Sequence, residues 1–94
     1  MPTGRAVEYS VYEWDELRNG VALEPPEGAV RAYLLAEGGI VRYLVGDRGE
    51  VPDVMYGMPL IPDFPEEFDT DLQYIRLRSA AQDVRLHVYY YRSA

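Results

Sequence analysis

The sequence contains no cysteine and no lysine, and His87 is its single histidine. Without cysteine, disulfides and thiolate metal sites are excluded. Without lysine, Schiff-base chemistry and the phosphate-binding lysine of a P-loop are excluded as well. A lone histidine also rules out metal sites that need several imidazole ligands. We therefore expect the chain to bind neither a metal ion nor a cofactor.

Long apolar runs are also missing. No segment approaches the ~18 consecutive apolar residues that a membrane-spanning helix requires. Near the N-terminus, Glu8 interrupts the short apolar stretch after Arg5, so the pattern of a secretory signal is not formed. These features predict a cytoplasmic protein with no membrane association.

What is present has the composition of one folded domain. Hydrophobic residues make up 48% of the 94 residues and aromatic residues 13%. A chain of this length buries roughly 60–65% of its unfolded surface, which is enough for one modest core. We therefore predict a single domain over residues 1–94. The net charge of −7 disfavours general affinity for nucleic acid and favours solubility or a basic partner.

Alternating apolar and polar residues indicate β-strands along most of the chain. The clearest signal is a pair of apolar runs, 29–36 and 40–45, which Gly38-Gly39 would join as a tight hairpin. A second hairpin is predicted from strands at 72–78 and 83–92. The predicted fold is mainly β: a small four- to five-stranded antiparallel sheet built from hairpins, with at most one short helix.

Two interpretations remain open for residues 11–19. Ser10 and Glu13 have the spacing of a capping box and Asn19-Gly20 suits a helix end, so a short helix is one interpretation, and the fold would then be α+β. Alternatively the first strand continues through Trp14 and turns at Asn19-Gly20. Further along, residues 50–56 are compatible with an edge strand, whereas 57–71 read as a long loop with one helical turn near Pro65.

Charge changes sign along the chain. Residues 72–94 contain four arginines against a single aspartate, whereas residues 1–71 contain five arginines against fifteen carboxylates. On the predicted C-terminal hairpin, arginines and tyrosines share one face with His87, and this face consists of Tyr74, Arg76, Arg78, Arg85, His87, Tyr89 and Tyr91. Forked guanidinium donors and stiff tyrosine rings suit recognition of a protein, and such rings also stack on nucleic-acid bases. The alternative is that these arginines pair with carboxylates of their own chain.

An acidic and aromatic segment precedes this hairpin. It consists of Asp63, Phe64, Glu66, Glu67, Phe68, Asp69 and Asp71. Carboxylates around exposed phenyl rings suit docking on a basic groove of another protein. The alternative is that the two phenylalanines cover the core while the carboxylates remain in solvent. The segment lacks the glycine and the distant glutamate of a calcium loop.

No catalytic constellation is present, because none of the three serines lies in a nucleophile-elbow context such as G-x-S-x-G. We therefore expect a non-enzymatic protein-binding module, such as a small acidic inhibitor or an assembly protein. The absence of lysine suggests a GC-rich genome and fits a bacterial or bacteriophage accessory protein. Two alternatives remain: a nucleic-acid-binding domain that uses the arginine and tyrosine face, and a self-associating component of a larger assembly.

Overall fold

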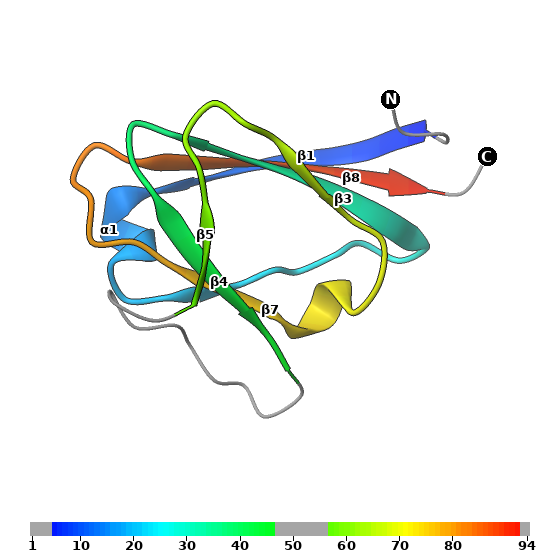
Figure 1. Ribbon diagram of the computed structural model, residues 1–94. Coiled ribbons are helices and arrows are strands. Elements are labelled where there is room, and N and C mark those ends of the chain that lie inside the picture. Colours follow the sequence, from blue (N-terminus) through cyan, green and yellow to red (C-terminus); the bar gives the residue numbers. More distant parts are fainter. Residues whose placement is uncertain (1–4, 47–56, 93–94) are drawn as a thin grey trace.

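The computed structural model describes residues 5–46 and 57–92, where antiparallel strands predominate (Figure 1). The strands form two four-stranded sheets. Sheet A has the order β1 (Arg5–Glu13), β8 (Arg85–Arg92), β3 (Ala29–Glu37) and β6 (Glu66–Phe68). Sheet B has the order β2 (Val21–Ala22), β7 (Ile75–Arg78), β4 (Val41–Val45) and β5 (Met58–Leu60). The prediction of a mainly β, antiparallel fold with at most one short α-helix is confirmed. The strands form two sheets of four rather than the single four- to five-stranded sheet that was predicted, because successive strands are divided between the sheets.

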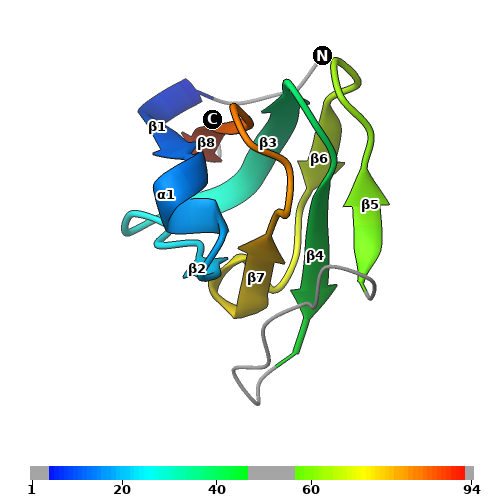
Figure 2. The ribbon, with the colours of Figure 1, turned by 90° about the vertical axis from the view of Figure 1, so that its left-hand side faces the viewer.

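The two sheets enclose one hydrophobic core. Figure 2 shows β7, β4 and β5 of sheet B side by side, and their inward side chains meet those of sheet A. Each large apolar side chain buried here contributes about 1.5–3 kcal/mol relative to an exposed position. The fully buried side chains include Leu34, Leu86, Val88 and Tyr90 from sheet A, and Val41, Leu60, Ile75 and Leu77 from sheet B.

The alternation predicted for the last strand is confirmed. In β8, Leu86, Val88 and Tyr90 point into the core, whereas His87 and Tyr89 between them point outward. Because successive side chains of a strand lie on opposite faces, one short sequence supplies both core and surface.

The predicted hairpin at Gly38-Gly39 is wrong. β3 pairs with β8 and β6, whereas β4 pairs with β7 and β5, so the two glycines lead the chain from one sheet to the other. Gly38 has a φ of +87°, and a Cβ there would lie 2.6 Å from the carbonyl oxygen of Asp83. A Cβ on Gly39 would lie 2.4 Å from that of Ala81. The glycines are needed for this close approach between sheets.

The predicted pairing of 72–78 with 83–92 is also wrong. The first strand corresponds to β7 in sheet B and the second to β8 in sheet A. The link between them is anchored by the buried Ser79, whose backbone N–H donates to Leu17 O at 3.1 Å. Its hydroxyl donates to Ile40 O at 2.6 Å and accepts from the N–H of Ala81 at 3.1 Å. These bonds hold the link against sheet B while the chain crosses to sheet A.

Residues 11–19 combine both interpretations. β1 continues to Glu13, and α1 (Trp14–Leu17) follows as a single turn. The capping interaction falls one turn later than predicted, because the Glu13 N–H donates to Glu16 Oε1 at 3.2 Å. No helix within residues 5–46 and 57–92 has the length and apolar character needed to cross a membrane.

The segment predicted as a long loop, 57–71, contains strands β5 and β6. The helical turn expected near Pro65 is instead part of the connection into β6, and a short 3-10 helix, η1 (Leu72–Tyr74), follows. The edge strand considered for residues 50–56 lies outside the described residues.

Substituting Gly38→Ala should destabilise the fold by about 2–4 kcal/mol, because the Cβ is disfavoured at positive φ and meets a backbone oxygen. Urea unfolding followed by circular dichroism measures this change. Gly46→Ala is the matched control, since a Cβ there meets nothing within 4 Å. Equal stability of the two variants would contradict the proposed role of the Gly38 corner.

Candidate functional site

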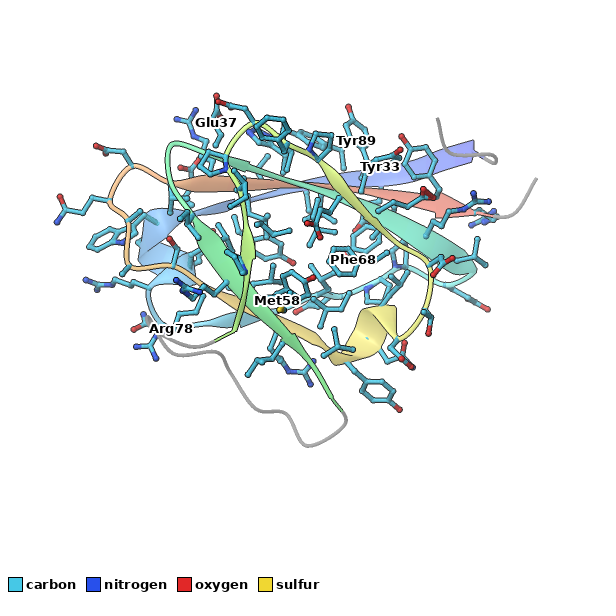
Figure 3. All side chains as sticks on the ribbon, viewed as in Figure 1. Tyr33, Glu37, Met58, Phe68, Arg78 and Tyr89 are labelled. Carbon is cyan, nitrogen blue, oxygen red and sulfur yellow. The ribbon has the colours of Figure 1, made fainter. Side chains whose placement is uncertain are left out.

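Several aromatic side chains of the sheet A strands lie on the outward side of the sheet and are exposed or partly exposed. The strand register places Tyr9 of β1 and Tyr33 of β3 on either side of Tyr89 of β8, in one row across three strands. Figure 3 shows Tyr33, Tyr89 and Glu37 on the same side of the molecule, directed away from the core. We call this surface the tyrosine face, which consists of Tyr9, Tyr33, Leu35, His87, Tyr89 and Tyr91.

The rings of the tyrosine face contact one another. The ring centroids of Tyr9 and Tyr89 are 4.7 Å apart, those of Tyr89 and Tyr91 6.3 Å, and those of Tyr33 and Tyr91 6.0 Å. Tyr9 is nevertheless 48% exposed and Tyr89 45%. Pro65 joins five residues of the face around a shallow, largely apolar hollow of about 270 Å³. Rings fixed by their neighbours lose little side-chain freedom when a partner binds, which favours a binding role.

His87 lies at the centre of a hydrogen-bonded chain on this face. Its Nε2 is 2.9 Å from Glu37 Oε1, and its Nδ1 is 2.6 Å from the Tyr9 hydroxyl. A carboxylate only accepts hydrogen bonds, so Nε2 carries the proton. In the neutral ring Nδ1 then accepts a hydrogen bond from Tyr9. The hydrogen bond from His87 lowers the pKa of Glu37.

Ion pairs surround the aromatic rows. Arg85 Nε lies 3.2 Å from both carboxylate oxygens of Glu13, and this hydrogen bond raises the pKa of Arg85. Arg31 Nη1 lies 3.7 Å from Glu67 Oε1. Arg31 and Arg85 are therefore each paired with a carboxylate from a neighbouring strand.

The predicted arginine and tyrosine face is divided by the structure. Arg85, Tyr89 and Tyr91 do share the outer side of sheet A, as predicted. Arg76 and Arg78 lie on β7 in sheet B, and Figure 3 shows Arg78 on the opposite side of the molecule from Tyr89. Tyr74 ends the 3-10 helix η1. The grouping fails because β7 and β8 belong to different sheets.

The acidic and aromatic segment is also divided. Phe68 is half-buried, with its ring centroid 5.0 Å from that of Tyr43, whereas Phe64 is 68% exposed. The alternative that both phenylalanines cover the core thus holds for Phe68 alone. The carboxylates are exposed, and Glu67 borders the tyrosine face through Arg31; the others are Asp63, Glu66, Asp69 and Asp71.

Sequence reasoning missed three members of the tyrosine face, namely Tyr9, Tyr33 and Leu35. Their alternation was visible, but the predicted hairpins did not bring β1 or β3 next to β8. The sequence did contain one signal: the alternation within residues 29–36 places Tyr33 and Leu35 on the same side of their strand.

No protein-family model matches the chain, and no curated protein or solved structure is significantly similar to it. Within residues 5–46 and 57–92, no three histidine, aspartate or glutamate side chains form a group that could hold a metal ion. We take the tyrosine face as the candidate functional site, because its side chains are held by contacts with one another and line an apolar hollow.

Glu37→Gln should reduce the loss of stability on acidification. The pKa of Glu37 is below its usual value of 4.5, so its ionised form stabilises the folded state above that value. This contribution disappears as the pH falls through the lower, folded-state pKa. Thermal unfolding between about pH 3 and pH 7 measures the difference.

Glu27→Gln, which alters an exposed glutamate outside the tyrosine face, is the control for the loss of one charge. If Glu37→Gln and wild type show the same dependence on pH, the link between Glu37 and His87 contributes nothing to stability.

Proposed function

We propose that this protein is a non-enzymatic protein-binding module and that the tyrosine face is its binding surface. The observation that carries the proposal is the row of Tyr9, Tyr89 and Tyr33 across three strands, beside an apolar hollow. Tyrosine is enriched among the residues that dominate binding energy at protein interfaces. The hydroxyl groups supply hydrogen bonds, while the rings supply apolar contact area.

The charged groups around the face support a protein as the partner. Arg85 and Arg31 are engaged by Glu13 and Glu67, so they offer little uncompensated positive charge to a phosphate backbone. Phosphate contacts supply most of the affinity for nucleic acid, and the net charge of −7 opposes them. Base stacking on the tyrosines is the alternative, and a low-salt binding assay with single-stranded oligonucleotides tests it directly.

We propose an accessory protein of a bacterium or bacteriophage that acts in the cytoplasm by occupying a surface of another protein, as an inhibitor or as an assembly factor. The absence of cysteine suits a reducing compartment.

The tyrosine face is tested by capture from the native host, followed by titration of the purified partner. Tyr89→Ala and Tyr33→Ala should each weaken binding by about 30-fold, the effect of losing a residue worth 2 kcal/mol. Gln73→Ala, an exposed residue on η1, is the control and should bind normally. Unchanged affinity of both tyrosine variants, with circular dichroism showing them folded, would place the binding surface elsewhere.

A further inference from the structure

Sheet A ends in one long edge strand. β1 has nine residues and pairs only with β8, so it forms one edge of the sheet (Figure 2). The other sheet edges within the described residues are β6 and β5, with three residues each, and β2, with two. Short edge strands protect a protein from pairing with other chains, whereas a long edge presents a row of free backbone groups. β1 is therefore the edge to which another strand can add.

The hydrogen bonds of sheet A show which backbone groups of β1 point into solvent. In β3, the Ala36 carbonyl accepts from the Asp63 N–H, so it points away from β8. Because these directions alternate along a strand, the groups of Leu35 point towards β8 and bond to its partner His87. Val11 lies opposite His87 on the other side of β8. Its N–H and its C=O are therefore both directed away from β8.

The same direction holds two residues to either side of Val11. The Glu13 N–H donates to Glu16 Oε1 at 3.2 Å, and this bond is possible because the N–H points away from β8. By the same alternation, the N–H and C=O of Tyr9 also point outward. Among the residues that the structure describes, no hydrogen bond reaches the outward backbone groups of Tyr9 and Val11. These two residues form an unused hydrogen-bonding edge.

A second copy of β1 can meet this edge in an antiparallel arrangement with a two-fold axis through one residue. An axis at Tyr9 would place Val11 opposite the β-bulge near the start of β1, where regular pairing is interrupted. An axis at Val11 would pair Tyr9 with Glu13, whose N–H is already bonded. An axis at Ser10 avoids both problems, because it pairs Tyr9 of each copy with Val11 of the other.

The side chains also fit an axis at Ser10. On the outer side of the sheet, Tyr9 would lie opposite Val11 of the other copy, and pairs of an aromatic and a β-branched residue stabilise sheets. On the core side, the two Ser10 residues would face each other and Glu8 would lie opposite Tyr12. Like charges are not opposed within this stretch, although each copy has a net charge of −7.

We propose that β1 of a second copy adds to β1 in this register, so that the two A sheets join into one continuous sheet in a symmetric dimer. Each Tyr9 N–H donates to Val11 O of the other copy, and each Val11 N–H donates to Tyr9 O. The contact is isologous and uses the β1 edges of both copies, so the assembly stops at the dimer.

The dimer has a consequence for the tyrosine face. A two-fold axis perpendicular to the joined sheet leaves both tyrosine faces on the same side. A partner with two copies of its docking surface would then bind more tightly through avidity. This consequence rests on the proposed function, whereas the dimer itself does not.

Cysteine cross-linking tests the register, because the chain has no cysteine of its own. Ser10→Cys places two sulfur atoms across the axis, where opposed Cα atoms are about 4.5 Å apart and a disulfide can form. Under a mild oxidant, this variant should give a covalent dimer at least tenfold faster than Glu8→Cys. In the proposed register the two Glu8 positions are about 13 Å apart along the strands, which is too far for a disulfide.

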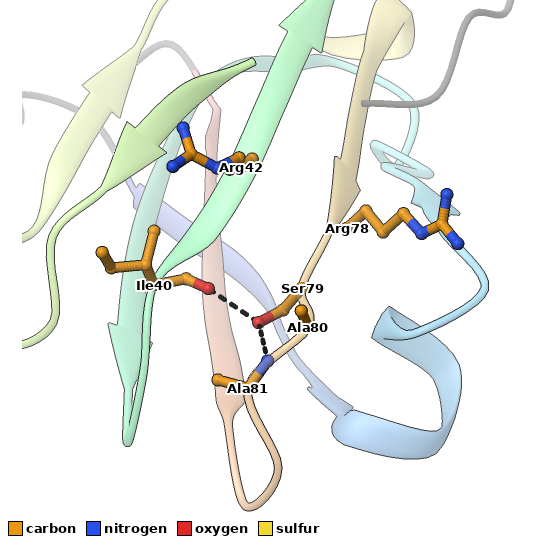
Figure 4. Close-up of a pocket in the computed structure, with 6 residues that line it drawn as sticks. All are labelled: Ile40, Arg42, Arg78, Ser79, Ala80 and Ala81. Atoms are coloured by element: carbon orange, nitrogen blue, oxygen red, sulfur yellow. Dashed lines mark hydrogen bonds between the residues drawn. The ribbon is translucent and has the colours of Figure 1, made fainter. Parts of the chain in front are cut away.

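Ala80→Cys is the control for random collision. Ala80 is exposed beside the sheet B hollow that Figure 4 shows, on a different sheet from β1. Its rate of cross-linking measures encounters that do not depend on pairing of β1. Equal rates for the three cysteine variants would overturn the proposal.

Analytical ultracentrifugation of the full chain from about 10 μM to about 1 mM measures the association itself. At physiological salt, where charges beyond about 8 Å are largely screened, wild type should form a dimer and no larger species. Val11→Pro removes an N–H that points away from β8, and proline is tolerated at such edge positions. It should weaken dimerisation at least tenfold. Val11→Thr keeps the N–H and the branched shape, so it should dimerise as wild type does.

A second variant covers the case in which circular dichroism shows Val11→Pro to be unfolded. Ser10→Arg places two positive charges directly opposite each other across the axis, so it should also weaken dimerisation at least tenfold. Tyr89→Ala should dimerise as wild type does, which separates the dimer from binding by the tyrosine face. A wild type that stays monomeric at every concentration would overturn the proposal. So would a dimer that the folded edge variants leave intact.

Discussion

The pairing of β8 with β1 on one side and β3 on the other is the interaction on which both the core and the tyrosine face depend. Leu86, Val88 and Tyr90 enter the core from this strand, and the residues between them form the middle of the surface. A register shift of one residue would exchange the two sets, exposing the apolar row and turning His87 into the core, away from Glu37. Core packing therefore holds the binding surface in position.

Local patterns predicted which side chains are buried, but they did not predict which strands are neighbours. Alternation is a property of adjacent residues and was sufficient to assign Ile75, Leu77 and the inner row of β8 to the core. Pairing depends on how two sheets close over one another. Gly38-Gly39 has the composition of a tight turn, and its true role comes from contacts with Ala81 and Asp83, more than forty residues away.

The candidate site was predicted in part for the same reason. Arg85, Tyr89 and Tyr91 were grouped correctly because they belong to one strand. Tyr9 lies beside them although it is far away in the sequence. Arg85 forms an ion pair with Glu13, which is 72 residues earlier. The change of charge sign along the sequence therefore does not mark one basic surface. In space, Arg85 lies on sheet A against Glu13, whereas Arg76 and Arg78 lie on sheet B and donate to backbone carbonyls.

The central position of β8 also bears on how the chain reaches this structure. β1 and β3 do not pair with each other, and β8, the strand that joins them, follows every other strand that the structure describes. Sheet A is therefore completed only once β8 has been made, through pairings between distant residues, which slows folding. Until then the edges of β1 and β3 remain open to other strands. Aggregation during synthesis, rather than unfolding of the finished domain, is the hazard that this topology creates.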